Sequence, residues 1–107
     1  MCHDAPPLRR IAGEVRGVFF NTEVFEVSDA DRFKEVLMSF RESLEAAGGS
    51  DVRVFRNVEK PNQIFSSMWW PTVEACHGWA AAHGEEVMKA SEGIVTSMDP
   101  EFLWEEF

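Results

Sequence analysis

Residues 62–75 have the sequence NQIFSSMWWPTVEA, in which a turn, a strand and the start of a helix follow one another without a loop. Asn62 is a typical turn residue, and the stretch from Gln63 to Trp70 has the composition of a strand. Thr72 is a good N-cap for the helix that follows. Such an abrupt junction fixes Trp70 beside the helix start, which favours a sheet packed directly against helices.

The chain before this junction predicts a strand, a helix and a second strand. Residues 15–27 are rich in Val and Phe, which predicts a strand. Residues 28–31 (SDAD) supply an N-cap and an acidic first turn. Apolar residues then recur at helical spacing until Gly48-Gly49 ends the helix. Residues 52–58 predict the second strand, which should form a hairpin with residues 63–70.

After the junction we expect a second helix, a loop and a closing strand. The helix should bend or break around His83-Gly84 and resume over residues 85–91. Residues 94–100 are predicted as a loop and residues 101–107 as the last strand. The order is β-α-β-β-α-β, the ferredoxin-like α+β pattern with an antiparallel sheet. Residues 1–14 are expected to be a loosely docked tail, and residues 15–107 a single domain.

Composition narrows the possible partners and the compartment. The 107 residues carry a net charge of -9 and no cluster of Lys and Arg, which argues against nucleic-acid and anionic-membrane partners. Cys2 and Cys76 form no disulfide framework, so a reducing cytoplasm is expected. The N-terminal residues contain no apolar run typical of a signal peptide or membrane anchor.

The predicted strands are apolar on both faces. In the first, one side carries Val18, Phe20 and Val24, and the other Phe19, Phe25 and Val27; in the third, Ile64, Met68 and Trp70 oppose Phe65 and Trp69. Two helices can cover only one face of a sheet, so something else must cover the second. A second copy of the same sheet is the simplest solution. We therefore expect a homodimer through the sheet face, with a pocket between sheet and helices.

This pattern resembles the antibiotic-biosynthesis-monooxygenase-like family of the dimeric α+β barrel superfamily over roughly residues 15–107. The resemblance is carried by residues 52–58 (VRVFRNV), the turn at 61–62, residues 68–75 (MWWPTVEA), Trp79, residues 86–89 (EVMK) and residues 100–102 (PEF). It implies a dimeric α+β barrel with a pocket on the sheet face. Its members include quinol-type oxygenases and haem-degrading proteins, so the reaction stays open.

Three residues are candidates for catalysis. Asn21 lies in mid-strand among apolar residues, where its amide either orients a ligand or pairs locally. Some family members place an Asn at the matching position, pointing into the pocket. Trp70 occupies the family's usual tryptophan position, where it can stack on an aromatic substrate or fill the core. Glu23 shares a face with Asn21 and is a general base if desolvated, or the partner of Arg53 in a salt bridge.

Six further residues are candidates for substrate binding: Phe19, Phe25, Arg53, Met68, His77 and His83. The aromatic and sulfur side chains would form an apolar wall, and Arg53 would meet an oxygen anion unless it is solvated at the rim. The histidines are candidate bases or iron ligands, with solvation or helix capping as the alternative. The haem-degrading relatives carry their iron-binding His near the position of Lys89, so His83 would have to substitute. No pattern predicts a bound metal.

Together with these candidate residues, the family resemblance implies a cofactor-free monooxygenase acting on an aromatic or quinol-like small molecule. A haem-binding or haem-degrading protein and a non-catalytic dimeric ligand-binding protein are the alternatives that the sequence leaves open. In each case the predicted ligand is small and apolar or aromatic.

Overall fold

The computed structural model describes residues 8–11 and 14–107, and their side chains from Gly17 onward. The elements are β1 (Leu8–Ile11), β2 (Glu14–Gly17), β3 (Phe19–Val27), α1 (Ala30–Ser39), α2 (Arg41–Ala46), β4 (Ser50–Arg56), β5 (Gln63–Trp70), α3 (Val73–Ala90), β6 (Val95–Met98) and β7 (Phe102–Glu105). None of the helices in these ranges is long and apolar enough to cross a membrane.

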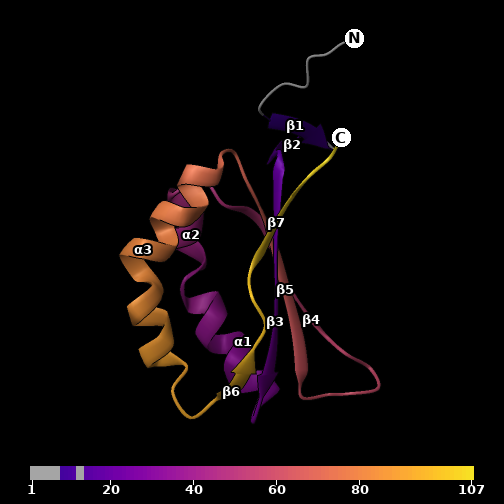
Figure 1. Ribbon diagram of the computed structural model, residues 1–107, viewed down its shortest axis with the longest axis vertical. Coiled ribbons are helices and arrows are strands. Elements are labelled where there is room, and N and C mark those ends of the chain that lie inside the picture. Colours follow the sequence, from indigo (N-terminus) through magenta and orange to yellow (C-terminus); the bar gives the residue numbers. More distant parts are fainter. Residues whose placement is uncertain (1–7, 12–13) are drawn as a thin grey trace.

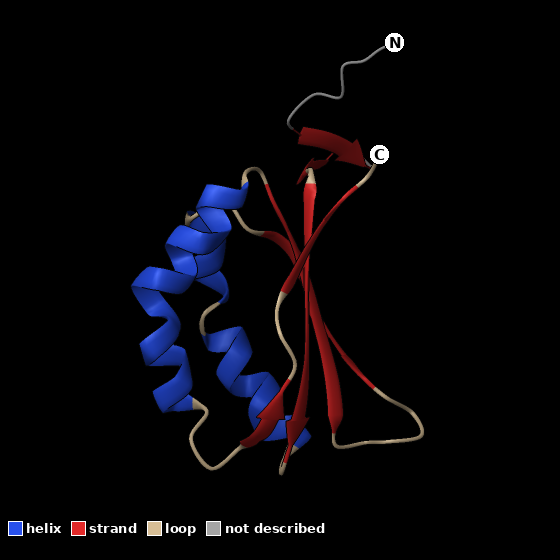
Figure 2. Ribbon diagram, in the orientation of Figure 1, coloured by secondary structure: helices blue, strands red, loops and turns tan. Residues whose placement is uncertain are grey.

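The main sheet is antiparallel and is centred on β3. Its order is β4-β5-β3, and both β6 and β7 pair with the remaining edge of β3. In the part of the chain that the structure describes, the three helices all lie on one face of this sheet and none covers the other face (Figures 1 and 2). The predicted ferredoxin-like α+β fold is therefore confirmed. The face with the helices is called the helix-facing side below, and the opposite one the open face.

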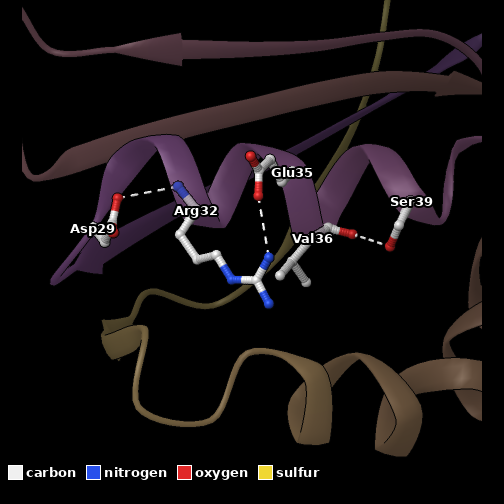
Figure 3. A network of polar contacts seen from close by, with 5 residues as sticks. All are labelled: Asp29, Arg32, Glu35, Val36 and Ser39. Atoms are coloured by element: carbon white, nitrogen blue, oxygen red, sulfur yellow. Dashed lines mark hydrogen bonds and ion pairs between the residues drawn. The ribbon is translucent and has the colours of Figure 1, made fainter.

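The start of α1 is stabilised by its own side chains (Figure 3). The carboxylate of Asp29 accepts a hydrogen bond from the backbone N–H of Arg32 at 3.1 Å, which is the expected N-cap contact. A cap of this kind stabilises a helix by about 1 kcal/mol. The guanidinium of Arg32 also lies 3.1 Å from Glu35, but both side chains are exposed, so this ion pair adds little.

The first predicted helix is divided into α1 and α2 at Phe40. The Phe40 N–H donates to the carbonyl of Leu37 at 3.1 Å, which tightens the turn. The hydroxyl of Ser39 donates to the carbonyl of Val36 and so satisfies an acceptor near the helix end. After α2, Gly48 adopts φ 111, a left-handed conformation that suits glycine at the end of a helix.

The predicted break at His83-Gly84 is wrong, because α3 is one continuous helix from Val73 to Ala90. The His83 ring packs on Trp79 with ring centroids 5.0 Å apart, and its Nδ1 lies 3.3 Å from Glu86. These contacts span about one turn in each direction and stabilise the helix at this point. Glycine inside a helix costs only about 1 kcal/mol, which the tertiary contacts of α3 offset.

Other boundaries differ from the prediction more modestly. The strand predicted over residues 15–27 is divided at Val18 into β2 and β3, and β6 occupies part of the predicted loop 94–100. Within the predicted tail, β1 pairs with β2 in a two-stranded antiparallel sheet, while residues 1–7 and 12–13 lie outside the described residues. β5 begins and ends where the strand over residues 63–70 was expected.

Two buried clusters hold the helices on the sheet. The first is centred on Trp70, which is 1% exposed and packs with Leu44 and Cys76. The second joins Phe25 of β3 to Phe33 of α1, whose ring centroids are 4.7 Å apart. Together they place the N-terminal end of α3 against the C-terminal end of β5, as the loopless junction at residues 70–73 requires.

Candidate functional site

A cavity of about 780 Å³ lies between the helix-facing side of the sheet and the three helices. Most of its lining is apolar. β3 and β5 contribute Asn21, Glu23, Phe25, Ser66, Met68 and Trp70 to the lining. α3 contributes Cys76, Trp79, Ala80, Gly84, Val87 and Met88. The chain after α3 contributes Glu92, Asp99, Pro100 and Glu101. A large apolar cavity with a few polar groups is the usual form of a small-molecule site.

The wall of the cavity beside Glu23 is formed by a break in the sheet. β6 and β7 are successive segments along the same edge of β3 (Figure 1). Phe25 pairs with Met98 and Thr22 with Phe102, so three steps along β3 correspond to four along its partner. The additional residue lies within residues 99–101, and Pro100 has no N–H to donate to a sheet. Bulges of this kind often redirect side chains next to functional sites.

Two hydrogen bonds attach this bulge to β3 on either side of Glu23. The N–H of Asp99 donates to the carbonyl of Val24 at 3.0 Å. The Asn21 amide Nδ2 donates to the carbonyl of Phe102 at 3.3 Å. The bulge is therefore held where Glu101 lines the cavity together with Glu23.

Glu23 is the most perturbed carboxyl group of the site. It lies opposite Ser66 in the β3–β5 pairing. Burial, and secondarily the negative charge of Glu101, raise its pKa from 4.5 to about 7. Such a group exchanges its proton near neutral pH, which suits a general base. The alternative partner, Arg53, instead contacts Asp51 at 2.9 Å.

Asn21 is 4% exposed and lines the cavity. Its amide makes the local pairing that the sequence left open, through the bond to Phe102. This bond uses the Nδ2 group, and the described part of the chain supplies no hydrogen-bond partner for Oδ1. The same side chain can therefore hold the bulge and accept a hydrogen bond from a ligand.

Trp70 combines a core position with a place in the cavity wall. Its six-membered ring lies close to Gly49, where a Cβ would be 3.4 Å from Cη2. The indole Nε1 is buried and has no hydrogen-bond partner within the described residues. Trp69 is on the open face, where its ring centroid is 4.7 Å from that of Phe20. Only Trp70 of this pair lines the cavity.

Several expected contact residues lie elsewhere. Phe25 and Met68 line the cavity, whereas Phe19 packs against the core cluster around Trp70. Arg53 pairs with Ser67 on the open face and is exposed. His77 is exposed, and His83 packs on Trp79 without lining the cavity.

Haem does not fit this arrangement by way of a histidine ligand. Both histidines of the described residues lie outside the cavity lining, so neither is placed to hold an iron there. In the same part of the chain, no group of three or more His, Cys, Asp or Glu side chains converges as a metal site.

Residues of the cavity wall that the sequence did not reveal include Ser66, Cys76 and Glu101. Burial first, and then the negative charges of Glu101 and Glu23, raise the pKa of the Cys76 thiol to about 12. Ser66 could have been found from its place on the same strand face as Met68 and Trp70. The signal for Glu101 was the Asp99-Pro100 pair, which interrupts a strand.

Comparison with known proteins shows which solved structures share this fold. No family model matches the sequence, and no curated protein does either. SnoaB of Streptomyces nogalater, a cofactor-independent oxygenase, has a similar structure with a TM-score of 0.71, 16% identity, and coverage of 83% of this chain and 92% of that one. An antibiotic biosynthesis monooxygenase predicted in Bordetella bronchiseptica has a TM-score of 0.66, 18% identity, and coverage of 83% and 94%.

A dimeric ferredoxin-like protein from an uncultured marine organism is also similar, with a TM-score of 0.59, 14% identity, and coverage of 83% of this chain and 90% of that one. The chain thus has the ferredoxin-like fold of the antibiotic biosynthesis monooxygenase-like proteins. At these identities the likeness is one of fold, and the activity has to be argued from the site.

Proposed function

We propose that this protein is a cofactor-independent monooxygenase that acts on an aromatic or quinol-like small molecule. The observation that carries the proposal is Glu23, a carboxyl group with a pKa of about 7 in the wall of an otherwise largely apolar cavity. The fold shared with SnoaB, itself a cofactor-independent oxygenase, supports this class of reaction.

Chemistry without a cofactor requires a substrate that supplies its own electrons. The Glu23 carboxylate would remove a proton from a ring-activated CH₂ or phenolic O–H group, which leaves an electron-rich anion. For a CH₂ substrate, reaction of this anion with O₂ converts CH₂ to C=O. One oxygen atom enters the product and the other leaves as water. The substrate provides all four electrons, so no external reductant is needed.

The surrounding residues would position the substrate. Met68, Phe25 and Trp70 offer an apolar and aromatic wall for a flat ring. The free Oδ1 of Asn21 would accept a hydrogen bond from a substrate hydroxyl two residues from Glu23. These contacts hold the reacting carbon near the base, which lowers the entropic part of the barrier.

We propose further that the protein is a homodimer through the open face of the sheet. This face exposes Phe55, Phe65, Phe102 and Trp104, and the half-buried Phe20–Trp69 pair also lies on it. Exposed apolar patches of this kind commonly mark protein interfaces. The dimeric ferredoxin-like protein with a similar fold supports the same arrangement.

Oxygen uptake with a panel of anthrones and hydroquinones tests the proposed reaction. We expect wild-type protein to accelerate uptake over the autoxidation measured with heat-denatured protein, and ¹⁸O₂ to label one oxygen atom of the quinone formed from an anthrone. Glu23→Gln should lose most of this activity. Glu26→Gln changes a glutamate on the same strand but on the open face, so it should retain activity. Full activity in Glu23→Gln would refute the role of Glu23, and tight binding without uptake would indicate a non-catalytic binding protein.

A further inference from the structure

The ionisable groups of the cavity wall share one sign. Its titratable side chains are Glu23, Glu92, Asp99, Glu101 and the Cys76 thiol. No Arg, Lys or His side chain is among the described residues that line the cavity. The cavity therefore combines four carboxyl groups with a lining that is mostly apolar.

This distribution discriminates strongly between ligand charges. An anionic ligand would meet like charges without a compensating cation, in surroundings where burial strengthens electrostatic interactions. A cationic group would gain from the same field. Repulsion of the wrong ligand is a common source of specificity.

We propose that the cavity binds an aromatic ligand that carries a protonated amino group, with the ammonium between Glu23 and Glu101 and the ring toward Met68 and Trp79. This inference rests on the proposed function only in assigning the same cavity as the substrate site. It adds the charge class of the ligand, which the fold does not specify.

Uncommitted polar atoms beside Glu23 support this assignment. Ser66 is 4% exposed, lies opposite Glu23 in the sheet and lines the cavity. Its side chain makes no hydrogen bond within the described part of the chain. An ammonium group has three donors and no acceptor. The two carboxyl groups and the Ser66 hydroxyl together offer it three acceptors.

A bound ammonium would also change the protonation of the site. Burial and Glu101 keep Glu23 partly protonated near neutral pH, with Asp99, Glu92 and the neutral Cys76 thiol as the other titratable groups of the wall. A cation nearby favours the carboxylate form. Binding of the amine should therefore release protons at a pH slightly below 7, whereas binding of an uncharged analogue should not.

The test compares three naphthalene probes that differ in charge: 2-naphthylmethylamine, 2-naphthalenemethanol and 2-naphthoic acid. Isothermal titration calorimetry near neutral pH should rank them in that order, with the amine at least about tenfold tighter than the acid. Titrations of the amine and the alcohol in two buffers of different ionisation enthalpy should reveal proton release with the amine only.

Two variants locate the effect. Glu101→Gln should reduce the ratio of amine to acid affinity several-fold, whereas Glu74→Gln, an exposed change on α3 outside the cavity, should preserve it. The inference is overturned if the acid binds as tightly as the amine, if Glu101→Gln leaves the ratio unchanged, or if the amine shows no binding at about 1 mM. The two proposals can fail separately, because this test measures binding and not turnover. A preference for the amine without oxygen uptake would refute only the proposed oxygenase reaction. Oxygen uptake without a preference for the amine would refute only this inference.

Discussion

Asn21 and Phe102 are 81 positions apart in the chain, yet the amide of one donates to the carbonyl of the other at 3.3 Å. This bond joins β3 to β7 immediately after the bulge that carries Glu101. The Asn21 side chain, two residues from the proposed base Glu23, therefore also holds the segment whose Glu101 helps to raise the pKa of Glu23. Stability and chemistry should both depend on Asn21.

Asn21→Ala should lower both turnover and stability. Loss of this partly buried hydrogen bond costs about 1 kcal/mol, and loss of the Oδ1 acceptor should reduce turnover further. Thr22→Val is the matched control, because the Thr22 hydroxyl accepts from Trp104 Nε1 at 2.9 Å and ties the same two strands together on the open face. Urea unfolding and oxygen uptake would be measured for both variants. Equal losses of turnover would mean that Asn21 acts only by holding β7.

Glu23 should make the protein less stable as the pH rises. The pKa of Glu23 is about 7 in the folded protein, whereas its ordinary value is 4.5. At a pH between these two values, the folded protein therefore keeps a proton on Glu23 that the unfolded protein has released. The contribution of Glu23 to the free energy of unfolding is therefore fully present at a pH below the unfolded-state pKa, and it is lost as the pH rises through the folded-state pKa. The loss is at most about 3 kcal/mol.

Urea unfolding of wild type and Glu23→Gln at about pH 5 and about pH 8 measures this contribution. The neutral variant should lose less stability over this interval, because its side chain does not ionise. An identical loss in both proteins would show that Glu23 titrates normally.

The open face should govern assembly. Phe55→Glu places a charge on a residue that is 48% exposed on this face, and should convert the proposed dimer to a monomer. Val58→Glu makes a comparable change at a residue that is 97% exposed in the β4–β5 connection, and should leave assembly unchanged. Native mass spectrometry distinguishes these outcomes. A wild-type monomer would contradict the proposed dimer.

Gly17 should not tolerate a side chain. A Cβ at this position would lie 2.3 Å from the Trp70 carbonyl carbon and 2.4 Å from its oxygen, both of which belong to the backbone. Gly17→Ala should therefore destabilise the protein by several kcal/mol, in the range of an overpacked core. Gly78→Ala in α3 is the control, since a Cβ there would meet nothing within 4 Å beyond its own helix backbone, and it should raise stability by about 0.5–1 kcal/mol. Thermal unfolding of the two variants should give opposite shifts in Tm.

Cys76 should be nearly inert to alkylation in the folded protein. With a pKa of about 12, roughly one thiol in ten thousand is ionised at about pH 8. Iodoacetamide labelling followed by peptide mass spectrometry separates Cys76 from Cys2. Cys76 should become reactive in urea, and rapid labelling of the native protein would show that its surroundings are more open than the structure indicates.

The strong local signals of the sequence predicted most of the fold. The strand over residues 63–70, an N-cap within residues 28–31, the cap at Thr72 and the glycine helix end depend on nearby residues, and each occurs in the structure. The continuity of α3 through Gly84 depends instead on the Trp79–His83–Glu86 contacts, which glycine propensity alone does not reveal. β6 was missed because it is short and its pairing with β3 is long-range.

The site was only partly accessible to the same reasoning. Asn21 and Glu23 were found because polar residues are unusual in an apolar strand. Glu101 reaches the cavity through a bulge, and a bulge is set by pairing between distant segments. Arg53 was expected near the ligand, but the alternation of β4 places it on the open face beside Asp51. Strand periodicity indicates which residues share a face, whereas the helices determine which face has the cavity.

The additional residue within 99–101 also determines which side chains of β7 point outward. Successive residues of a strand alternate between faces, so a shift by one position exchanges them all. If the same residues paired with β3 without this bulge, β6 and β7 would be continuous in register, with Phe102 opposite Asn21 and Leu103 opposite Phe20. Leu103 would then move to the open face, and Phe102 and Trp104 would point at the helices. The bulge in this short connection thus sets both the surface that a partner would meet and the space left for a ligand.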